Sequence, residues 1–142
     1  MSKSTLVYAP GVWDLLHYGH TRFLQRASEL GDVLIVGVAS DHCVLEDKGR
    51  FPTVSDVDRA EVLHALLCVD EVEIYYVLDF VQRLEHWKPD VLAIGEQWGS
   101  ELRHRRAEAW VKQRGGDIQI IPYTNTISTT SIKESIREES EN

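Results

Sequence analysis

The stretch Val33-Leu34-Ile35-Val36-Gly37-Val38-Ala39 decides the fold. Its residues are apolar almost without interruption, whereas a strand with one face in water alternates apolar and polar positions. A run of this kind is typical of a central parallel strand that is covered by helices on both faces. The stretch therefore predicts a sheet that is buried inside a layered α/β domain.

Shorter apolar runs recur on both sides of this stretch and alternate with segments that have helical spacing. Gly31 is expected to end the first helix in a left-handed conformation, and Ser55 is expected to cap the second. Alternating strands and helices imply right-handed crossovers within one parallel sheet. The predicted strands are 6–9, 33–39, 72–77, 91–94 and 118–121, and the predicted helices are 18–30, 57–69, 80–87, 101–114 and 131–139. Residues 1–142 are thus expected to form a single domain, with 136–142 as a frayed acidic tail.

The composition excludes several classes of protein. The chain has 142 residues, of which 43% are hydrophobic and 27% charged, as in one globular domain and unlike a disordered chain. No apolar run reaches the roughly 18 residues that a membrane span needs. The formal net charge of −8 disfavours nucleic acid as a partner. Two cysteines and no signal-peptide pattern make the cytoplasm the expected location.

Pro10 to His20 follows the first strand, at the edge where open parallel sheets bind ligands. His17 and His20 are three residues apart and share one face at the start of a helix. With the free amides of that helix start, two imidazoles make an anion site. Two surface histidines and a zinc pair are the alternative interpretations, although no third ligand stands at zinc spacing.

Two more segments follow strands in the same way. Ile127-Ser128-Thr129-Thr130-Ser131 opens the last helix, and its hydroxyls either cap that helix or bind phosphate. Gly95-Glu96-Gln97-Trp98 carries an indole that either faces a base or packs on the next helix. Lys48 and Arg50 lie in a predicted loop that either closes over a polyphosphate or is merely solvated. Neither glycine-rich phosphate-loop pattern occurs in the chain.

Together these segments resemble the small bacterial cytidylyltransferases of the nucleotidyltransferase superfamily, above all glycerol-3-phosphate cytidylyltransferase. The resemblance runs from Leu6 to about Ile136 and rests on Gly11 to His20, with its HxGH pair, and on Ile127 to Ile132. Asp58-Arg59-Ala60-Glu61 and Val69-Asp70-Glu71-Val72 also look like family signatures. The histidine pair and the ISTT segment are far more specific together than either is alone.

The resemblance implies a Rossmann-like nucleotidyltransferase fold with a five-stranded parallel sheet. It implies transfer of a nucleotidyl group to a phosphorylated alcohol, with release of pyrophosphate, Mg²⁺ as the companion of the triphosphate, and a homodimer. His17, His20, Lys48 and Arg59 would be catalytic, and Asp14, Lys48 and Tyr123 would face the second substrate. The residues expected to bind the nucleotide are Gly11, Val12, Trp13, His17, His20, Gly95, Trp98, Ile127, Ser128, Thr129 and Thr130.

Some positions depart from the family pattern. Tyr123 stands where the family has an arginine, and Glu96-Gln97 replace Asp-Asp. A tyrosine can stack or form one hydrogen bond but cannot neutralise charge, so we expect an unusual acceptor. Asp14 either supports its loop or lies near the metal ion.

The leading hypothesis is a CTP-dependent enzyme that transfers CMP to a phosphorylated or phosphonate small alcohol. A heptose-type adenylyl- or guanylyltransferase is the alternative enzyme, supported by Asp47-Lys48-Gly49-Arg50 and Asp58-Arg59-Ala60-Glu61. A non-catalytic nucleotide-binding module is the alternative of another class. A module of that kind has no need of both His17-His20 and the hydroxyl cluster.

Overall fold

The computed structural model describes residues 3–123 and 129–141. Its elements alternate as the sequence predicts, with one additional helix between the second and third strands. The strands are β1 (Leu6–Gly11), β2 (Val33–Ala39), β3 (Glu71–Tyr75), β4 (Val91–Ile94) and β5 (Asp117–Ile120). The helices are α1 (Tyr18–Ser28), α2 (Asp41–Lys48), α3 (Asp56–His64), α4 (Val81–Trp87), α5 (Leu102–Gln113) and α6 (Thr129–Glu141).

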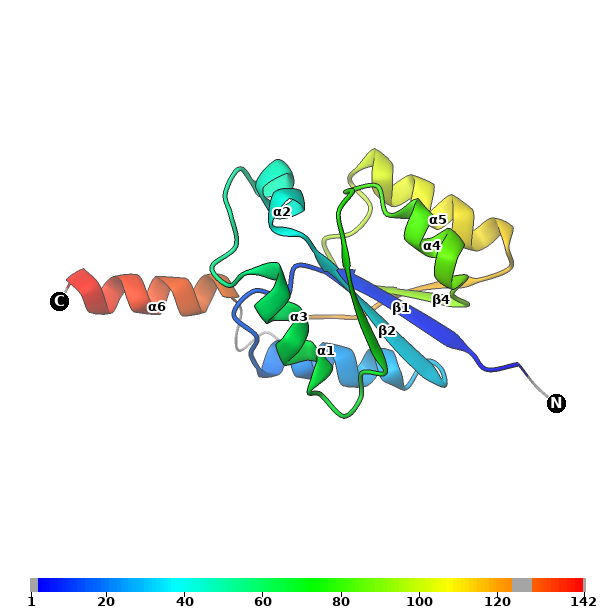
Figure 1. The fold of residues 1–142 in the computed structure, drawn as a ribbon, viewed down its shortest axis with the longest axis horizontal. Helices are drawn as coiled ribbons and strands as arrows, with labels where there is room; N and C mark the ends of the chain where they lie inside the picture. The colour runs from blue at the N-terminus through cyan, green and yellow to red at the C-terminus, as the bar shows by residue number, and fades with distance from the viewer. Residues whose placement is uncertain (1–2, 124–128, 142) are drawn as a thin grey trace.

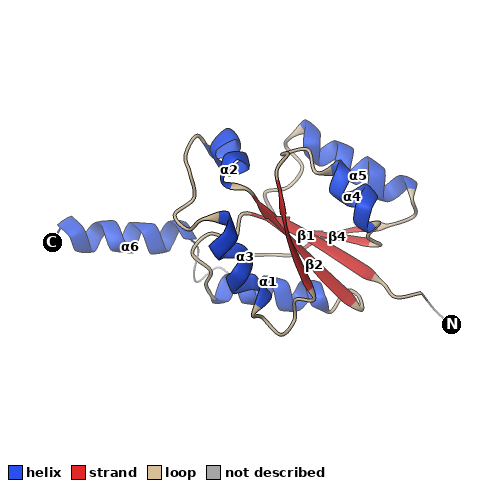
Figure 2. Cartoon of the chain, in the orientation of Figure 1, coloured by secondary structure: helices blue, strands red, loops and turns tan. Residues whose placement is uncertain are grey.

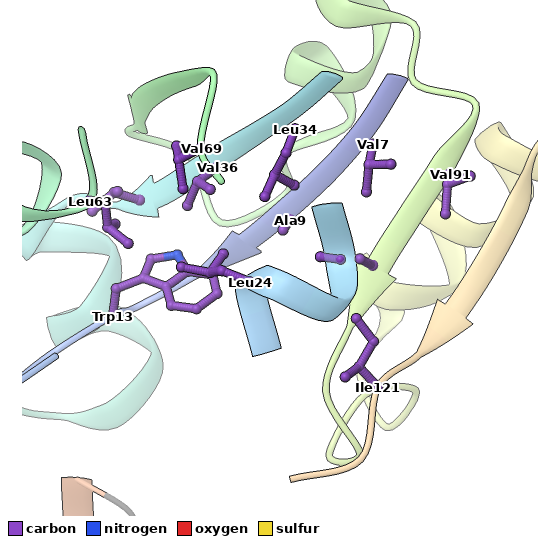
Figure 3. Close-up of a cluster of buried hydrophobic side chains, with 13 residues drawn as sticks. Val7, Ala9, Trp13, Leu24, Leu34, Val36, Leu63, Val69, Val91 and Ile121 are labelled. Atoms are coloured by element: carbon purple, nitrogen blue, oxygen red, sulfur yellow. The ribbon is translucent and has the colours of Figure 1, made fainter. Parts of the chain in front are cut away.

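The five strands form one parallel sheet, as predicted, and their order is β3-β2-β1-β4-β5. Helices α1 and α3 cover one face, and α2, α4 and α5 cover the other (Figures 1 and 2). Alternate residues of β1 serve the two layers, since Val7 packs with Leu24 and Leu63 whereas Tyr8 packs with Leu84. Figure 3 shows the first of these cores, with Trp13 at its edge. The two cores explain why β2 is apolar throughout.

Several predicted boundaries are wrong for physical reasons. Helix α1 ends at a right-handed cap, Glu29, so Gly31 has no left-handed role. Gly31 lies so close to the first strand that a Cβ would stand 2.6 Å from the carbonyl oxygen of Thr5. Lys48 is the last residue of α2 rather than part of a loop, and Ser40 caps that helix.

Ser55 caps α3 as predicted, through a hydrogen bond that its hydroxyl accepts from the amide of Asp58. The helix ends at His64 instead of continuing to Val69, and a turn leads from it into β3. The last helix, α6, continues to Glu141 instead of ending at residue 139, and the expected frayed tail at 136–142 stays a prediction. In Figure 1 this last helix projects from the body of the domain.

The strand order places a ligand crevice beside β1. Connections leave β1 toward β2 on one side and reach β4 on the other, so the chain winds in opposite directions from this point. Loops at the carboxyl ends of β1 and β4 are therefore held apart, which is where open α/β sheets bind their ligands. Among residues 3–123 and 129–141, no helix has the length and apolarity to cross a membrane.

Candidate active site

A cavity of about 630 Å³ opens at the carboxyl ends of β1 and β4. This volume suits a nucleotide-sized ligand. The start of α1, the end of α2 and the start of α6 surround it. Its lining residues are Pro10, Gly11, Val12, Trp13, Asp14, His17, Gly19, His20, Phe23, Val44, Lys48, Arg50, Pro52, Gly95, Gln97, Tyr123, Thr129, Thr130, Ser131 and Lys133.

Trp13 anchors the turn that joins β1 to α1. Its backbone has a φ of 59°, and Leu15 has a φ of 49°, both in a region that side chains larger than glycine rarely adopt. The indole is 7% exposed and donates from Nε1 to the carbonyl oxygen of Gly37 at 3.0 Å. Its edge meets the ring of His20, with 5.7 Å between the centroids. Trp13 therefore closes the base of the cavity and holds a histidine in place.

The two histidines cap α1 with their own rings. Nδ1 of His17 accepts from the amide of Gly19 at 3.1 Å, and Nδ1 of His20 accepts from the amide of His17 at 3.2 Å. Because Nδ1 is an acceptor in each ring, the proton of each neutral imidazole is on Nε2. The rings lie next to each other, with centroids 4.0 Å apart and a tilt of 30° between their planes. Two Nε2–H donors are thus available side by side.

Burial keeps both imidazoles neutral. It lowers the pKa of His17, and it lowers the pKa of His20 to about 4 with a further contribution from the His17 charge. At pH 7 both rings are uncharged hydrogen-bond donors. The described residues thus favour an anion site here over a zinc pair. Nδ1 of each ring already accepts from a backbone amide, and Nε2 carries the ring proton, so neither nitrogen has a lone pair free for zinc.

Asp14 connects three segments of the cavity wall. Its carboxylate accepts from the amides of Thr53 and Val54 at 2.8 and 2.9 Å, and it lies 3.5 Å from the ammonium of Lys133. Burial raises the pKa of Asp14, but these amides and the ammonium outweigh it and leave the pKa below its ordinary value. Of the two roles that the sequence left open for Asp14, the structure shows support of the loop.

Helix α6 presents its first turn to the cavity. The hydroxyl of Thr129 donates to the carbonyl oxygen of Asp14 at 2.8 Å, and Thr130 lies beside it in the cavity wall. Their amides belong to the helix N-terminus, where the macrodipole favours an anion. The predicted nucleotide-binding residues Ile127 and Ser128 lie outside the described residues.

Lys48 and Arg50, for which the sequence left a polyphosphate contact and a solvated loop open, line the same cavity from the end of α2. Lys133 joins them from the second turn of α6. Sequence analysis missed Lys133, although its position four residues after Thr129 puts it on the same helix face. Ser131, a member of the hydroxyl cluster named in the sequence, lines the cavity, as does Gln97, for which no role was predicted. Three cations thus surround a cavity in a protein whose net charge is −8.

The prediction that Arg59 faces the substrate is wrong. Its side chain is only 1% exposed, and its guanidinium donates to the carbonyl oxygens of Val12, Ala39 and Val54 at 2.6–2.8 Å and to Asp41 at 2.8 Å. Every one of these partners belongs to the protein. Arg59 fastens the ends of β1 and β2 to the loop before α3.

Tyr123, which follows β5, and Trp98, in the turn after β4, are placed differently. The phenol of Tyr123 covers Gly95 so closely that a Cβ there would stand 2.7 Å from its oxygen, and Tyr123 lines the cavity. Burial raises the pKa of this phenol. Trp98 packs on α5, with its ring stacked on His104 at 4.0 Å between centroids. Of the two interpretations of Trp98, packing on the next helix is the one the structure shows.

The described residues do not form a protein cage for Mg²⁺. They contain no group of three or more histidine, cysteine, aspartate or glutamate side chains that could hold a metal ion. The oxygens of Asp14 are already bonded to two amides and an ammonium. Mg²⁺ as a companion of the triphosphate stays a prediction.

A twisted parallel sheet of this order, with a histidine-capped helix and a second helix N-terminus at its switch point, defines a nucleotide-binding α/β domain. The family model for cytidylyltransferase-like proteins matches residues 8–135. The chain belongs to this family, and the predicted resemblance to nucleotidyltransferases is confirmed. The Rossmann-like fold expected from that resemblance is confirmed as well.

Individual relatives show how broad the family is. The chain is 41% identical over 125 residues to the FAD synthase of Thermococcus sibiricus, covering 85% of this chain and 82% of that protein. It is 37% identical over 133 residues to the bifunctional protein HldE of Geotalea uraniireducens. That match covers 93% of this chain but only 27% of the relative, so the chain spans about a quarter of HldE.

A solved structure shares the fold. The lipopolysaccharide core biosynthesis protein from Thermoplasma volcanium superimposes with a TM-score of 0.71 and 25% identity, over 86% of this chain and 98% of that one.

Replacing Arg59 by methionine tests its structural role. We expect a loss of roughly 3 kcal/mol in the free energy of unfolding, because the change leaves Asp41 and three carbonyl oxygens without their partner. Urea unfolding measures it, with Val62→Ala on the exposed side of the same helix as the control. If the Arg59→Met variant has normal stability but binds substrate poorly, Arg59 contacts the substrate after all.

The lowered pKa of His20 predicts a pH-dependent stability. Between pH 4 and pH 6.5 the unfolded chain binds a proton at His20 that the native chain does not, so the free energy of unfolding falls as pH falls through this window. After allowance for partial exposure, we expect a loss on the order of 2 kcal/mol. In His20→Asn the amide oxygen can still accept from His17 without titrating, and thermal melts should show a flatter profile. An equal slope in both proteins would contradict the assignment.

Proposed function

We propose that this protein is an adenylyltransferase that transfers AMP from ATP to the phosphate of a small phosphorylated acceptor and releases pyrophosphate. One observation carries the proposal. The paired Nε2–H donors of His17 and His20 and the first turn of α6 face one cavity that Lys48, Arg50 and Lys133 also line. Such an arrangement matches a polyphosphate, which needs many donors along its length.

The relatives support adenine over cytosine. FAD, the product in the name of the Thermococcus relative, is an adenylylated phosphate, and the part of HldE that this chain matches belongs to the heptose adenylyltransferases. Both reactions join AMP to a phosphate monoester. The relatives thus support the hypothesis of a heptose-type adenylyltransferase better than the hypothesis of a CTP-dependent enzyme.

The cavity wall also suits a purine. Tyr123 is about half exposed and holds its ring beside Gly95, where it offers a flat apolar face on which a base can stack. Gln97 adds an amide with both a donor and an acceptor for a base edge. Tyr123 lines the same cavity as the histidines and the first turn of α6, so we assign it to the nucleotide. The sequence analysis favoured a contact with the acceptor instead.

The reaction needs no nucleophile from the protein. An oxygen of the acceptor phosphate, ionised at pH 7, attacks the α-phosphorus, and the bond from that phosphorus to the oxygen bridging to the β-phosphorus breaks. His17 and His20 donate to the triphosphate, and Lys48 and Lys133 offset the charge that develops. Catalysis then rests on positioning and on electrostatic stabilisation. Mg²⁺ would add positive charge to the phosphates when bound.

The decisive experiment measures pyrophosphate release with ATP, CTP and GTP against heptose, glycerol and flavin phosphates. Release with ATP above the other nucleotides is the expected result. Preference for CTP would support the second candidate, a CTP-dependent enzyme similar to glycerol-3-phosphate cytidylyltransferase. The match to the cytidylyltransferase-like family model is the observation that favours this candidate. Nucleotide binding without release from any pair would support the non-catalytic module.

A homodimer is part of the proposal. Asp70, near which the family resemblance implies a subunit contact, directly precedes the edge strand β3, and Leu67 before that strand and Tyr76 after it expose apolar side chains. Sedimentation equilibrium checks this directly, and a monomer across the micromolar range would contradict it.

Removing either histidine ring should slow turnover. His17→Ala and His20→Ala are each expected to lower kcat by about a hundredfold, the effect of losing one transition-state donor. His64→Ala, on the exposed last residue of α3, is the matched control. Both variants should keep a native circular dichroism spectrum. Near-normal turnover in both histidine variants would show that the two rings do not act on the phosphates.

A further inference from the structure

A second, smaller cavity of about 160 Å³ adjoins the first. The two cavities share Pro10, Gly11, Val12, Val44 and Lys48, so they are separated by little more than the end of β1 and one lysine. The smaller cavity lies toward α5, on the side of the sheet that α2, α4 and α5 cover. A group held there would reach the larger cavity past Lys48.

Aromatic rings form one wall of this second cavity. Phe80 and Trp98 meet at 6.0 Å between centroids with a tilt of 48°, and Tyr75 packs on Phe80 at 5.7 Å. The orientation of Trp98 is fixed, since its Nε1 donates to Glu108 at 2.8 Å and its ring stacks on His104. Trp98 is thus a rigid wall, and it belongs to this cavity rather than to the nucleotide cavity.

Polar side chains from α2 and α5 complete the lining together with apolar residues such as Val12, Val44 and Leu78. Arg103 and Asp47 form an ion pair at 2.9 Å, with their side chains 21% and 30% exposed. Lys48 stands at the boundary with the nucleotide cavity. An ammonium at the boundary suits a phosphate, and a carboxylate with a guanidinium suits hydroxyl groups, which both donate and accept. Aromatic faces beside such groups suit the C–H faces of a polyhydroxy compound.

The volume limits what can enter. A cavity of about 150 Å³ is filled by one benzene molecule, so a cavity of this size holds a single six-membered ring or a short chain. A fused three-ring system such as a flavin needs more than twice that space. The wall that would have to move to admit it is Trp98, which is held by Glu108 and His104.

We propose that the second cavity is the acceptor site and that Trp98 sets the size limit, so that the acceptor is a one-ring sugar phosphate or a short polyol phosphate and not a flavin phosphate. This inference rests on the proposed nucleotidyl transfer. The acceptor phosphate meets Lys48, and its oxygen forms the new bond to the α-phosphorus as pyrophosphate departs. The carbon skeleton lies against Trp98 and Phe80, with its hydroxyls toward Asp47 and Arg103.

The first test uses the intact protein with a non-hydrolysable ATP analogue. Calorimetry measures binding of the analogue, and then binding of a heptose phosphate, glycerol 3-phosphate or riboflavin 5′-phosphate to the preformed complex. We expect the analogue to bind, and a sugar or polyol phosphate to bind while the flavin does not. Flavin binding, or failure of every sugar and polyol phosphate to bind after the analogue has bound, overturns the size limit. Failure of the analogue itself counts against the proposed function instead.

The second test changes the wall. Trp98→Ala removes one side of the cavity, and we expect the KM for the sugar or polyol phosphate to rise about tenfold, the effect of losing one aromatic contact. The KM for ATP should stay unchanged, and flavin phosphate should gain turnover. Trp98→Phe keeps an aromatic wall and should recover most of the acceptor affinity even if the alanine variant is unstable. Leu102→Ala, exposed on α5, is the control. A rise in the KM for ATP, or an acceptor KM in Trp98→Ala equal to that of the control with no gain of flavin turnover, overturns the role of Trp98.

Discussion

The carboxylate of Asp14 is the constraint on which the site depends. It is almost buried, and it accepts from the amides of Thr53 and Val54 while lying beside the ammonium of Lys133. A carboxylate in such a place is costly unless every oxygen has partners. Meeting that requirement joins the turn after β1 to the loop before α3 and to α6. Three segments far apart in sequence thus converge on one cavity because one buried charge has to be satisfied.

Arg59 does the same for the layer beneath. An arginine guanidinium has more hydrogen-bond donors than any other side chain. In Arg59 these donate to carbonyl oxygens at the ends of β1 and β2 and to the carboxylate of Asp41. Asp41 and Asp56 in turn each accept from the other's backbone amide at 2.9 Å. The site is therefore built on two buried charges, one of each sign, that contact protein groups rather than substrate. The side chains left for the substrate are neutral imidazoles, hydroxyls and partly exposed cations.

The parts of this arrangement that sequence reasoning reaches are those that repeat a local pattern. The apolar run of β2 predicts a covered strand, and the spacing of His17 and His20 predicts one helix face. The parts it misses depend on contacts between distant segments. Nothing near Arg59 in sequence tells a solvent-facing cation from a buried one, since its partners lie 20 and 47 positions away at Ala39 and Val12. Gly31 likewise looks like a helix stop, whereas its role is a close approach to Thr5.

The cavity is lined by two kinds of hydrogen-bond donor, the neutral imidazoles and the positively charged lysines and arginine. This difference in charge affects turnover in the proposed reaction. A site made only of fixed cations would bind pyrophosphate as tightly as it binds the transition state, and release would then limit the rate. His17 and His20 are neutral at pH 7, because burial depresses the pKa of each ring. Neutral donors gain most where negative charge increases during the reaction and hold the departing product less strongly than ammonium groups do. In the proposed reaction, the lysines and the arginine that line the cavity would attract the triphosphate into an otherwise acidic protein, and the partly buried imidazoles would act on the transferred group.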